Sequence, residues 1–204
     1  MNISYAIPVC IEHIELEKLL KFLTSHIDKD DEIVVQCDQG NTTHEVHRVL
    51  GDFPTVKIIE FPLKGDFASF KNNLKEHCTK EWIFQIDADE LPTYHLIKNL
   101  KELLRLNPTT ELFLVPRVNT VKGLTEEHIN KWRWNVNEKG WVNWPDYQTR
   151  IIQNGPKIKW QNKVHEQIVG MSTRALLPAE EEWALYHPKH ILRQEAQNNF
   201  YDTI

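Results

Sequence analysis

The chain has 204 residues, 41% of them hydrophobic and 26% charged, a composition typical of a single soluble globular domain. Its net charge of -5 at pH 7 provides no broad basic surface, which argues against nucleic acid as a partner. We expect no transmembrane segment, since no apolar run approaches about 18 residues, and the three cysteines show no CxxC spacing. These features predict a soluble cytoplasmic protein with free thiols and no zinc site.

Short apolar stretches alternate with amphipathic stretches in the first half of the chain. Strands are expected at residues 2–9, 32–37, 55–61 and 81–86. Helices are expected over residues 14–23, from a cap at 41–43 to about 50, from a cap at Asp66 to about 78, and from Thr93 to before 107. This alternation predicts an α/β fold in which helices flank a mostly parallel sheet. Ligands of such sheets bind beyond the carboxyl ends of the strands.

The second half of the chain changes character, because residues 111–185 hold most of the tryptophans. Strand-like runs at 111–118, 147–153 and 157–160 predict a smaller, mixed sheet region. Residues 119–144 have a weak periodic pattern and many aromatic side chains, which predicts a functional lid or binding loop. The alternative is that the tryptophans simply pack beneath this loop.

The acidic end of the fourth expected strand is the clearest sign of chemistry. Residues 81–90 read Glu-Trp-Ile-Phe-Gln-Ile-Asp-Ala-Asp-Glu, an apolar strand that delivers Asp87, Asp89 and Glu90 to one small region. Such charges repel one another unless a cation or a phosphate-bound metal lies among them. We therefore expect an edge of the active site here. The alternative is an aspartate pair that merely caps the following helix near Thr93.

A series of motifs in this order resembles family 2 glycosyltransferases of the GT-A fold, in the branch related to lipopolysaccharide core-type transferases. The motifs are Val-Val-Gln-Cys-Asp-Gln-Gly-Asn-Thr at 34–42, Gly-Asp-Phe-Ala-Ser-Phe-Lys-Asn-Asn at 65–73, Ile-Asp-Ala-Asp-Glu-Leu-Pro at 86–92, Asp-Tyr-Gln-Thr-Arg at 146–150 and Trp-Gln-Asn-Lys-Val-His-Glu at 160–166. A lone Asp-X-Asp is common by chance, whereas the ordered series is specific. The resemblance covers nearly the whole chain.

The resemblance implies a single Rossmann-like GT-A domain over 1–204, with a nucleotide-sugar-binding half at 1–92 and an acceptor-binding half at 93–204. It implies inverting transfer of a sugar from a UDP- or GDP-linked donor to a hydroxyl of a glycan, a lipid-linked sugar or a protein glycan. The diphosphate that leaves develops negative charge, which Mn²⁺ or Mg²⁺ stabilises. By resemblance Asp89 binds this cation, Asp87 approaches the ribose or a metal-bound water, and His187 is a further metal ligand.

The resemblance also places the nucleotide at the strand ends and at the start of the third helix. The residues concerned are Pro8, Val9 and Cys10 in the base pocket, with Asp38, Asp66 and Lys71. Asp38 could instead be a turn residue before Gly40, and Lys71 a solvated lysine on a helix face. Lys71 stands where many relatives have arginine, so it would meet a phosphate as a point charge.

An inverting transferase needs a carboxylate that removes the proton of the acceptor hydroxyl. Glu166 lies about where the family places this acidic motif, and it is the predicted base. Asp146 is the reserve candidate for base or acceptor contact, although it could only brace the tryptophan-rich loop. His165, beside Glu166, is expected to orient a neighbour or pack in the core.

Two other classes of protein remain open from the sequence. A nucleotidyltransferase-like enzyme could use the same carboxylates, but it would carry a glycine-rich basic loop near the first strand, where residues 8–10 offer none. A catalytically silent carbohydrate-binding domain could use the tryptophan-rich loop for stacking. We also expect that the chain could be one module of a longer protein.

Overall fold

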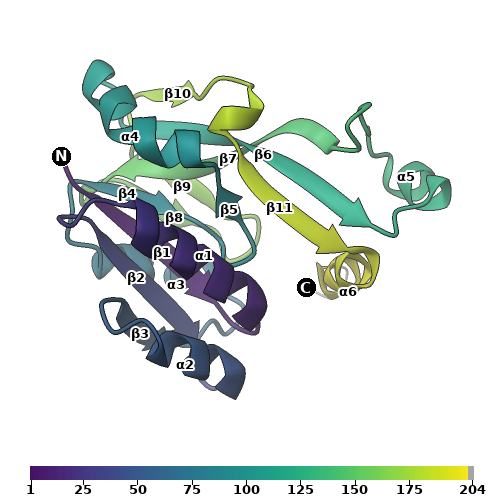
Figure 1. The fold of residues 1–204 in the computed structure, drawn as a ribbon, viewed down its shortest axis with the longest axis horizontal. Coiled ribbons are helices and arrows are strands. Elements are labelled where there is room, and N and C mark those ends of the chain that lie inside the picture. Colours follow the sequence, from purple (N-terminus) through teal and green to yellow (C-terminus); the bar gives the residue numbers. More distant parts are fainter. Residues whose placement is uncertain (202–204) are drawn as a thin grey trace.

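Residues 1–201 are described in the computed structural model of the chain, whose largest element is a nine-stranded sheet (Figure 1). Its strands are β1 (Ile3–Val9), β2 (Glu32–Asp38), β3 (Lys57–Phe61), β4 (Trp82–Gln85), β5 (Leu91–Pro92), β6 (Leu112–Lys122), β7 (Val142–Gln153), β10 (Arg174–Leu176) and β11 (Leu185–His190). They lie in the order β3-β2-β1-β4-β7-β6-β11-β5, with β10 beside β6.

Most strands of this sheet are parallel, as the sequence predicted. The strands β1 to β4 pair in parallel, and so do β6, β10 and β11. The strand β7 is antiparallel to both β4 and β6, and β5 is antiparallel to β11. The mixed strands of the second half therefore extend the central sheet. A separate two-stranded sheet is formed by β8 (Lys159–Gln161) and β9 (Gln167–Val169).

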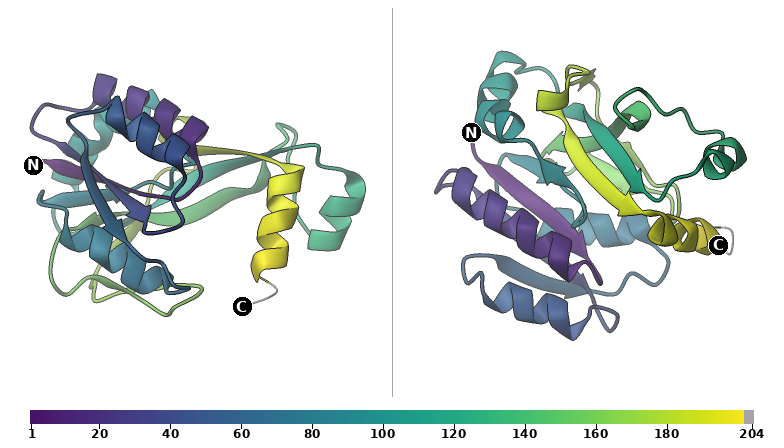
Figure 2. Two further views of the ribbon diagram at one scale, coloured as in Figure 1. Left: turned by 90° about the horizontal axis from the view of Figure 1, so that it is seen from below. Right: turned by 45° about the vertical axis from the view of Figure 1, so that its right-hand side comes forward.

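Helices cover both faces of the sheet. They are α1 (His13–His26), α2 (His44–Gly51), α3 (Phe67–Glu76), α4 (Tyr94–Leu106), α5 (Glu126–Trp132) and α6 (Ile191–Tyr201), with a short 3₁₀ turn η1 (Glu181–Trp183). Apolar side chains of α1, α2 and α4 pack in one core cluster, and those of α3, β8 and β9 pack in another. The ribbon in Figure 2 shows α1 and α2 on one side of the sheet and α3 on the other. Alternate residues of β1 reach the two clusters, with Tyr5 in the first and Ala6 in the second.

Two of the three predicted helix caps are confirmed. The Asp66 side chain accepts a hydrogen bond from the Ser69 amide at 2.9 Å, and the Thr93 side chain accepts one from the Leu96 amide at 3.1 Å. The cap predicted at 41–43 is different in detail, because Thr43 occupies the N-cap of α2 without a side-chain hydrogen bond. The Asn41 side chain instead donates to Asp38, at the end of β2.

Residues 119–144 are more regular than the sequence suggested. The strand β6 continues to Lys122, α5 follows, and β7 begins at Val142, so β6 and β7 project from the body as an arm with α5 at its tip (Figure 1). Trp141 is buried and packs against Trp144, with ring centroids 4.9 Å apart. The prediction of an irregular loop was wrong at both ends of this segment, because β6 pairs with β11 as far as Lys122 and β7 begins at Val142.

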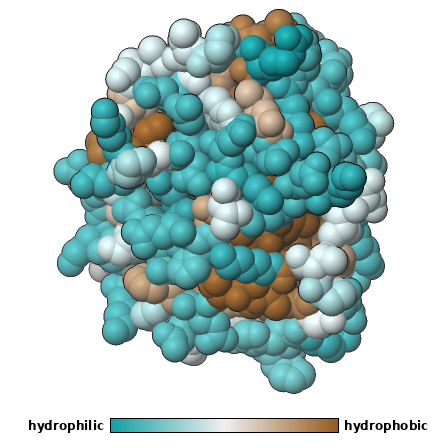
Figure 3. Space-filling view, turned by 90° about the vertical axis from the view of Figure 1, so that its left-hand side faces the viewer, coloured by the Kyte–Doolittle hydropathy of each residue, from teal (hydrophilic) through white to brown (hydrophobic). Residues whose placement is uncertain are grey.

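The described surface is mainly hydrophilic, and Figure 3 shows one face on which a hydrophobic patch interrupts it. Within the described part, no helix combines the length and apolar character that a membrane span requires. Cys10, Cys37 and Cys78 are free thiols, as predicted, and the last two are buried. Most large apolar side chains therefore lie in the clusters around the sheet.

Candidate active site

A cavity of about 460 Å³ opens at the carboxyl ends of β1, β2 and β4. We call it the main cavity. Its lining combines predicted site residues, namely Pro8, Val9, Cys10, Asp38, Lys71, Asp87, Asp89 and Glu166, with Glu12, Leu63, Phe67, Phe70, Ala88, Arg193 and Ala196. Parallel strands end at a common edge of the sheet, which is why residues far apart in the sequence meet here.

Asp38 lines the main cavity and also holds the turn that follows β2. One carboxylate oxygen accepts a hydrogen bond from the Leu63 amide at 2.9 Å, and the other accepts one from the Asn41 side chain at 3.0 Å. Its carbonyl accepts hydrogen bonds from the Asn41 and Thr42 amides. The predicted binding position and the alternative turn role are therefore compatible in this structure.

Two arginines neutralise the acidic residues behind the cavity. Arg150 of β7 donates to Glu90 at 2.6 Å and 3.0 Å and to Asp87 at 2.5 Å. Arg117 of β6 donates to Glu90 at 3.0 Å and to Asp146 at 2.7 Å. We call these residues, Asp87, Glu90, Arg117, Asp146 and Arg150, the Arg150 network. The arginines of this network are positively charged partners for the acidic residues after β4, and they offset the mutual repulsion that the close spacing of these residues suggests.

The network favours the ionised form of Asp87 and of Asp146. Burial alone raises the pKa of Asp87, but the charges of Arg150 and Lys71 outweigh burial and hold that pKa below its ordinary value. Burial likewise opposes ionisation of Asp146, whereas the charge of Arg117 and hydrogen bonds from Asn119 lower its pKa overall. Both carboxylate oxygens of Asp146 therefore already accept hydrogen bonds from neighbouring side chains.

Asp89, which lines the main cavity, faces His187 of β11. The Asp89 Oδ2 atom lies 3.3 Å from His187 Nε2. The Asn119 side chain donates to Asp146 at 2.8 Å, so its oxygen faces His187 Nδ1 at 2.7 Å and makes that nitrogen the proton donor. His187 Nε2 is then turned toward Asp89. Burial opposes ionisation of Asp89, yet the positive charges around it, those of Arg193 and Lys189 among them, lower its pKa overall.

This pair fits a divalent cation. Two ligands at about 2.1 Å in adjacent octahedral positions lie about 3 Å apart, close to the separation of Asp89 Oδ2 and His187 Nε2. Metal ligation by one ring nitrogen of a histidine requires the tautomer in which the other ring nitrogen carries the proton and donates a hydrogen bond to a neighbour. The described residues contain no cluster of three or more candidate ligands, so such a cation would take its remaining oxygens from a phosphate and water.

Lys71 and Glu166 form an ion pair at the wall of the main cavity. Lys71 lies on α3, and Glu166 lies in the connection between β8 and β9. The Lys71 ammonium also lies 4.4 Å from the centre of the Trp160 ring. The predicted base is thus brought to the same cavity as the predicted metal-binding aspartate, although they are far apart in the sequence.

Three predicted site residues lie outside the lining of the main cavity. Asp66 directs its carboxylate to the backbone and hydroxyl of Ser69 as a helix cap. Asp146 and His187 line a second cavity of about 240 Å³, together with Asn119 and Trp134. The two cavities are adjacent, because His187 in the second contacts Asp89 in the main cavity.

The sequence did not indicate that two arginines, Arg150 and Arg193, contact residues of the candidate site. Arg150 belongs to the motif at 146–150, but it was given no role, although three acids within residues 87–90 indicate a need for a buried cation. Arg193 lines the main cavity from α6, and no motif in the sequence marks it. Its position depends on contacts between the two ends of the chain.

The fold is that of a GT-A protein, and the comparison with known families is specific. Residues 4–173 match the model of glycosyl transferase family 2, and the chain belongs to this family. The predictions of the family and of the GT-A fold are confirmed.

Relatives by sequence include the SPbeta prophage-derived glycosyltransferase SunS of Bacillus subtilis (strain 168) and the glycosyltransferase SunS of Bacillus phage SPbeta. Each is 30% identical over 153 residues, which cover 75% of this chain and 32% of the relative. The chain therefore spans about a third of the length of these relatives.

Solved structures of S. aureus TarS share the fold. The crystal structure of TarS 1–349 has a TM-score of 0.62 and 11% identity, covering 92% of this chain and 60% of that one. The same fragment in complex with UDP has a TM-score of 0.61 and 12% identity, with the same coverage. At this identity the likeness establishes the fold alone.

Replacement of Arg150 by methionine is expected to destabilise the protein by about 3–5 kcal/mol, because it leaves the buried Glu90 and the half-buried Asp87 without their main partner. The free energy of unfolding in urea measures this loss. The matched control is Arg105→Met on α4, which removes an exposed pair with Glu102 and should leave stability near that of the wild type. Equal stabilities of the two variants would contradict the role given to the network.

Proposed function

We propose that the chain is the catalytic domain of an inverting, metal-dependent glycosyltransferase. The observation that carries this proposal is the main cavity, in which Asp87 and Asp89 meet Glu166 beside the apolar ends of the first strands. Membership of glycosyl transferase family 2 supports the class of reaction. The proposed catalytic domain spans residues 1–204, with the nucleotide-binding half at 1–92 and the acceptor-binding half at 93–204.

The nucleotide is proposed to bind at the ends of β1 and β2. Pro8, Val9 and Cys10 offer backbone and apolar surface to a flat heterocycle, and Asp38 offers a carboxylate oxygen at the same wall. The cavity volume of about 460 Å³ suits a small-molecule site. Structures of TarS with UDP and with UDP-GlcNAc support a uridine donor, and a GDP-linked donor is the alternative.

Asp89 and His187 would hold Mn²⁺ or Mg²⁺, which supplies positive charge to the leaving diphosphate. Asp87 is held by Arg150 at the adjacent wall, where it can accept a hydrogen bond from the ribose or from water. Lys71 contributes a further positive charge, and it exchanges its contact with Glu166 for a phosphate oxygen when the donor binds.

Glu166 is the proposed base. The acceptor oxygen forms a bond to the anomeric carbon while the bond from that carbon to the diphosphate breaks, and the hydroxyl proton passes to Glu166. Attack from the face opposite the leaving group inverts the anomeric centre. Asp146 is less suited to this step, because its oxygens already accept hydrogen bonds from Arg117, Asn119 and Gln148. We assign it to orienting His187 through Asn119.

The proposed acceptor is a glycan-type molecule, a sugar chain that is free, lipid-linked or attached to protein. The second cavity supports this choice, because it combines the Trp134 ring with amide side chains of Asn119, Asn143 and Gln194. Aromatic faces and amides are the groups that sugars commonly contact. A catalytically silent carbohydrate-binding domain remains the second candidate, and nucleotide binding distinguishes the two.

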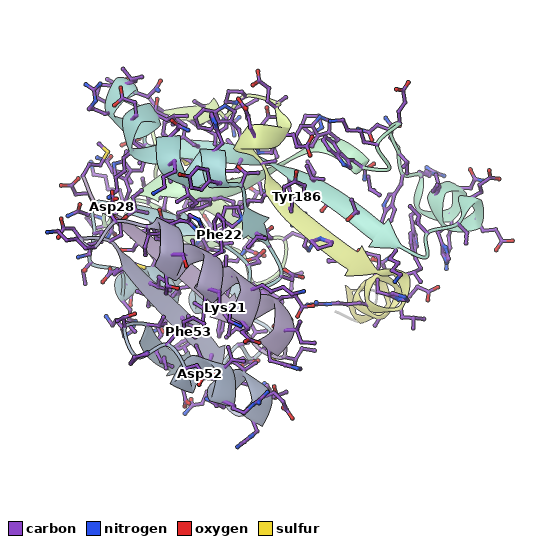
Figure 4. The ribbon with its side chains drawn as sticks, in the orientation of Figure 1. Lys21, Phe22, Asp28, Asp52, Phe53 and Tyr186 are labelled. Carbon is purple, nitrogen blue, oxygen red and sulfur yellow. The ribbon has the colours of Figure 1, made fainter. Side chains whose placement is uncertain are left out.

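Replacement of Asp89 by asparagine is expected to weaken Mn²⁺-dependent binding of the nucleoside diphosphate by about tenfold or more, since it removes a charged cation ligand. Calorimetric titration with UDP and with GDP, with and without Mn²⁺, measures this. The control is Asp52→Asn at the end of α2, on the outer side of the molecule (Figure 4). If neither nucleotide binds the wild-type chain, a catalytically silent carbohydrate-binding domain becomes the better-supported function.

Replacement of Glu166 by glutamine is expected to lower the rate of donor turnover by about 100-fold or more, because the amide cannot accept the proton. Nucleotide affinity should be unchanged or higher, since Lys71 loses its competing partner. Release of nucleoside diphosphate from the donor measures turnover, and the same titration measures affinity. A variant that keeps the wild-type rate would remove Glu166 from the role of base.

A further inference from the structure

Arg193 reaches the main cavity from the opposite end of the chain. It lies in the first turns of α6, which directly follows β11 and stands at its end (Figure 2). Its guanidinium lies 2.9 Å from a carboxylate oxygen of Glu12 and 3.3 Å from Asp89 Oδ2, the oxygen that also faces His187. Its side chain is 35% exposed, so it is accessible from the cavity mouth.

The charges of the main cavity favour a positively charged group such as the Arg193 guanidinium. Acidic side chains outnumber basic ones in its lining, where Lys71 and Arg193 are the lysine and arginine that the described residues supply. Lys71 is paired with Glu166 at one wall before the donor binds, and it offers a phosphate a single point charge. A nucleoside diphosphate that enters this acidic cavity carries more negative charge than Lys71 balances, and a guanidinium presents two parallel donors that match two phosphate oxygens.

We propose that Arg193 is a donor-binding residue that donates hydrogen bonds to the diphosphate of the nucleotide sugar. The inference rests on the proposed function. A cation held by Asp89 would bring the diphosphate beside this carboxylate, and Arg193 already lies 3.3 Å from Asp89 Oδ2. The contact with Glu12 holds the Arg193 guanidinium in this position at the cavity.

The competing explanation is that Arg193 merely fastens α6 to α1 through Glu12 and Glu15. Among the described side chains of α6, Ile191 is buried and Arg193 is half-buried, so both roles are compatible with the packing. The two explanations differ in what they predict for ligands. A fastening role affects nucleoside and nucleoside diphosphate alike, whereas a phosphate contact affects the diphosphate alone.

The test compares wild type with Arg193→Gln and Arg193→Lys by calorimetric titration in Mn²⁺. The probes are UDP and GDP, each with its nucleoside, uridine or guanosine. Arg193→Gln is expected to weaken binding of the diphosphate by about tenfold or more and to leave nucleoside binding within about twofold. Arg193→Lys should recover part of the affinity, because lysine restores the charge without the fork. Arg105→Gln, at an exposed position of α4, is the control and should match the wild type.

Unchanged diphosphate affinity in Arg193→Gln would overturn the inference while leaving the proposed function in place. Equal weakening of nucleoside and diphosphate would also overturn it, in favour of the fastening role. A wild-type chain that binds neither UDP nor GDP would overturn the proposed function and this inference with it. Thermal unfolding of each variant establishes that the fold is intact before the titrations are compared.

Discussion

The Glu90 carboxylate has no exposed side-chain surface, and the geometry of the main cavity depends on how its charge is neutralised. A buried carboxylate without a partner costs several kcal/mol, so the chain must bring cations to it. Arg150 and Arg117 do so from β7 and β6. Because Arg150 also binds Asp87, the interaction that solves a burial problem simultaneously fixes the first aspartate of the Asp-X-Asp motif.

The same constraint connects the two halves of the chain. The antiparallel strand β7 lies between β4 and β6, which brings Arg150 and Arg117 to the carboxyl end of β4. From Arg117 a chain of contacts passes through Asp146 and Asn119 to His187, and so to Asp89. The candidate metal ligand of the second half is therefore oriented by the network that stabilises the first half.

The sequence was sufficient for features that depend on local chemistry. The strands of the first half were predicted because each is a short apolar run that ends in polar residues, and Asp66 and Thr93 were recognised as caps from residue type and position. The arm at 119–144 was missed because the end of β6 pairs with β11, a strand much later in the chain. Arg150 pairs with a residue 60 positions away, and the Arg193 contact with Asp89 joins still more distant segments, so no local pattern signals either one.

In the proposed function, the Arg150 network positions Asp89 and His187 to hold one divalent cation beside the nucleotide. A crystal structure with UDP and Mn²⁺, with anomalous diffraction collected at the manganese edge, tests this directly. The account predicts an anomalous peak within ligand distance of Asp89 Oδ2 and His187 Nε2, with Arg150 still bound to Asp87 and Glu90. Bound UDP with manganese elsewhere, or with Asp89 turned away from the metal, would contradict it.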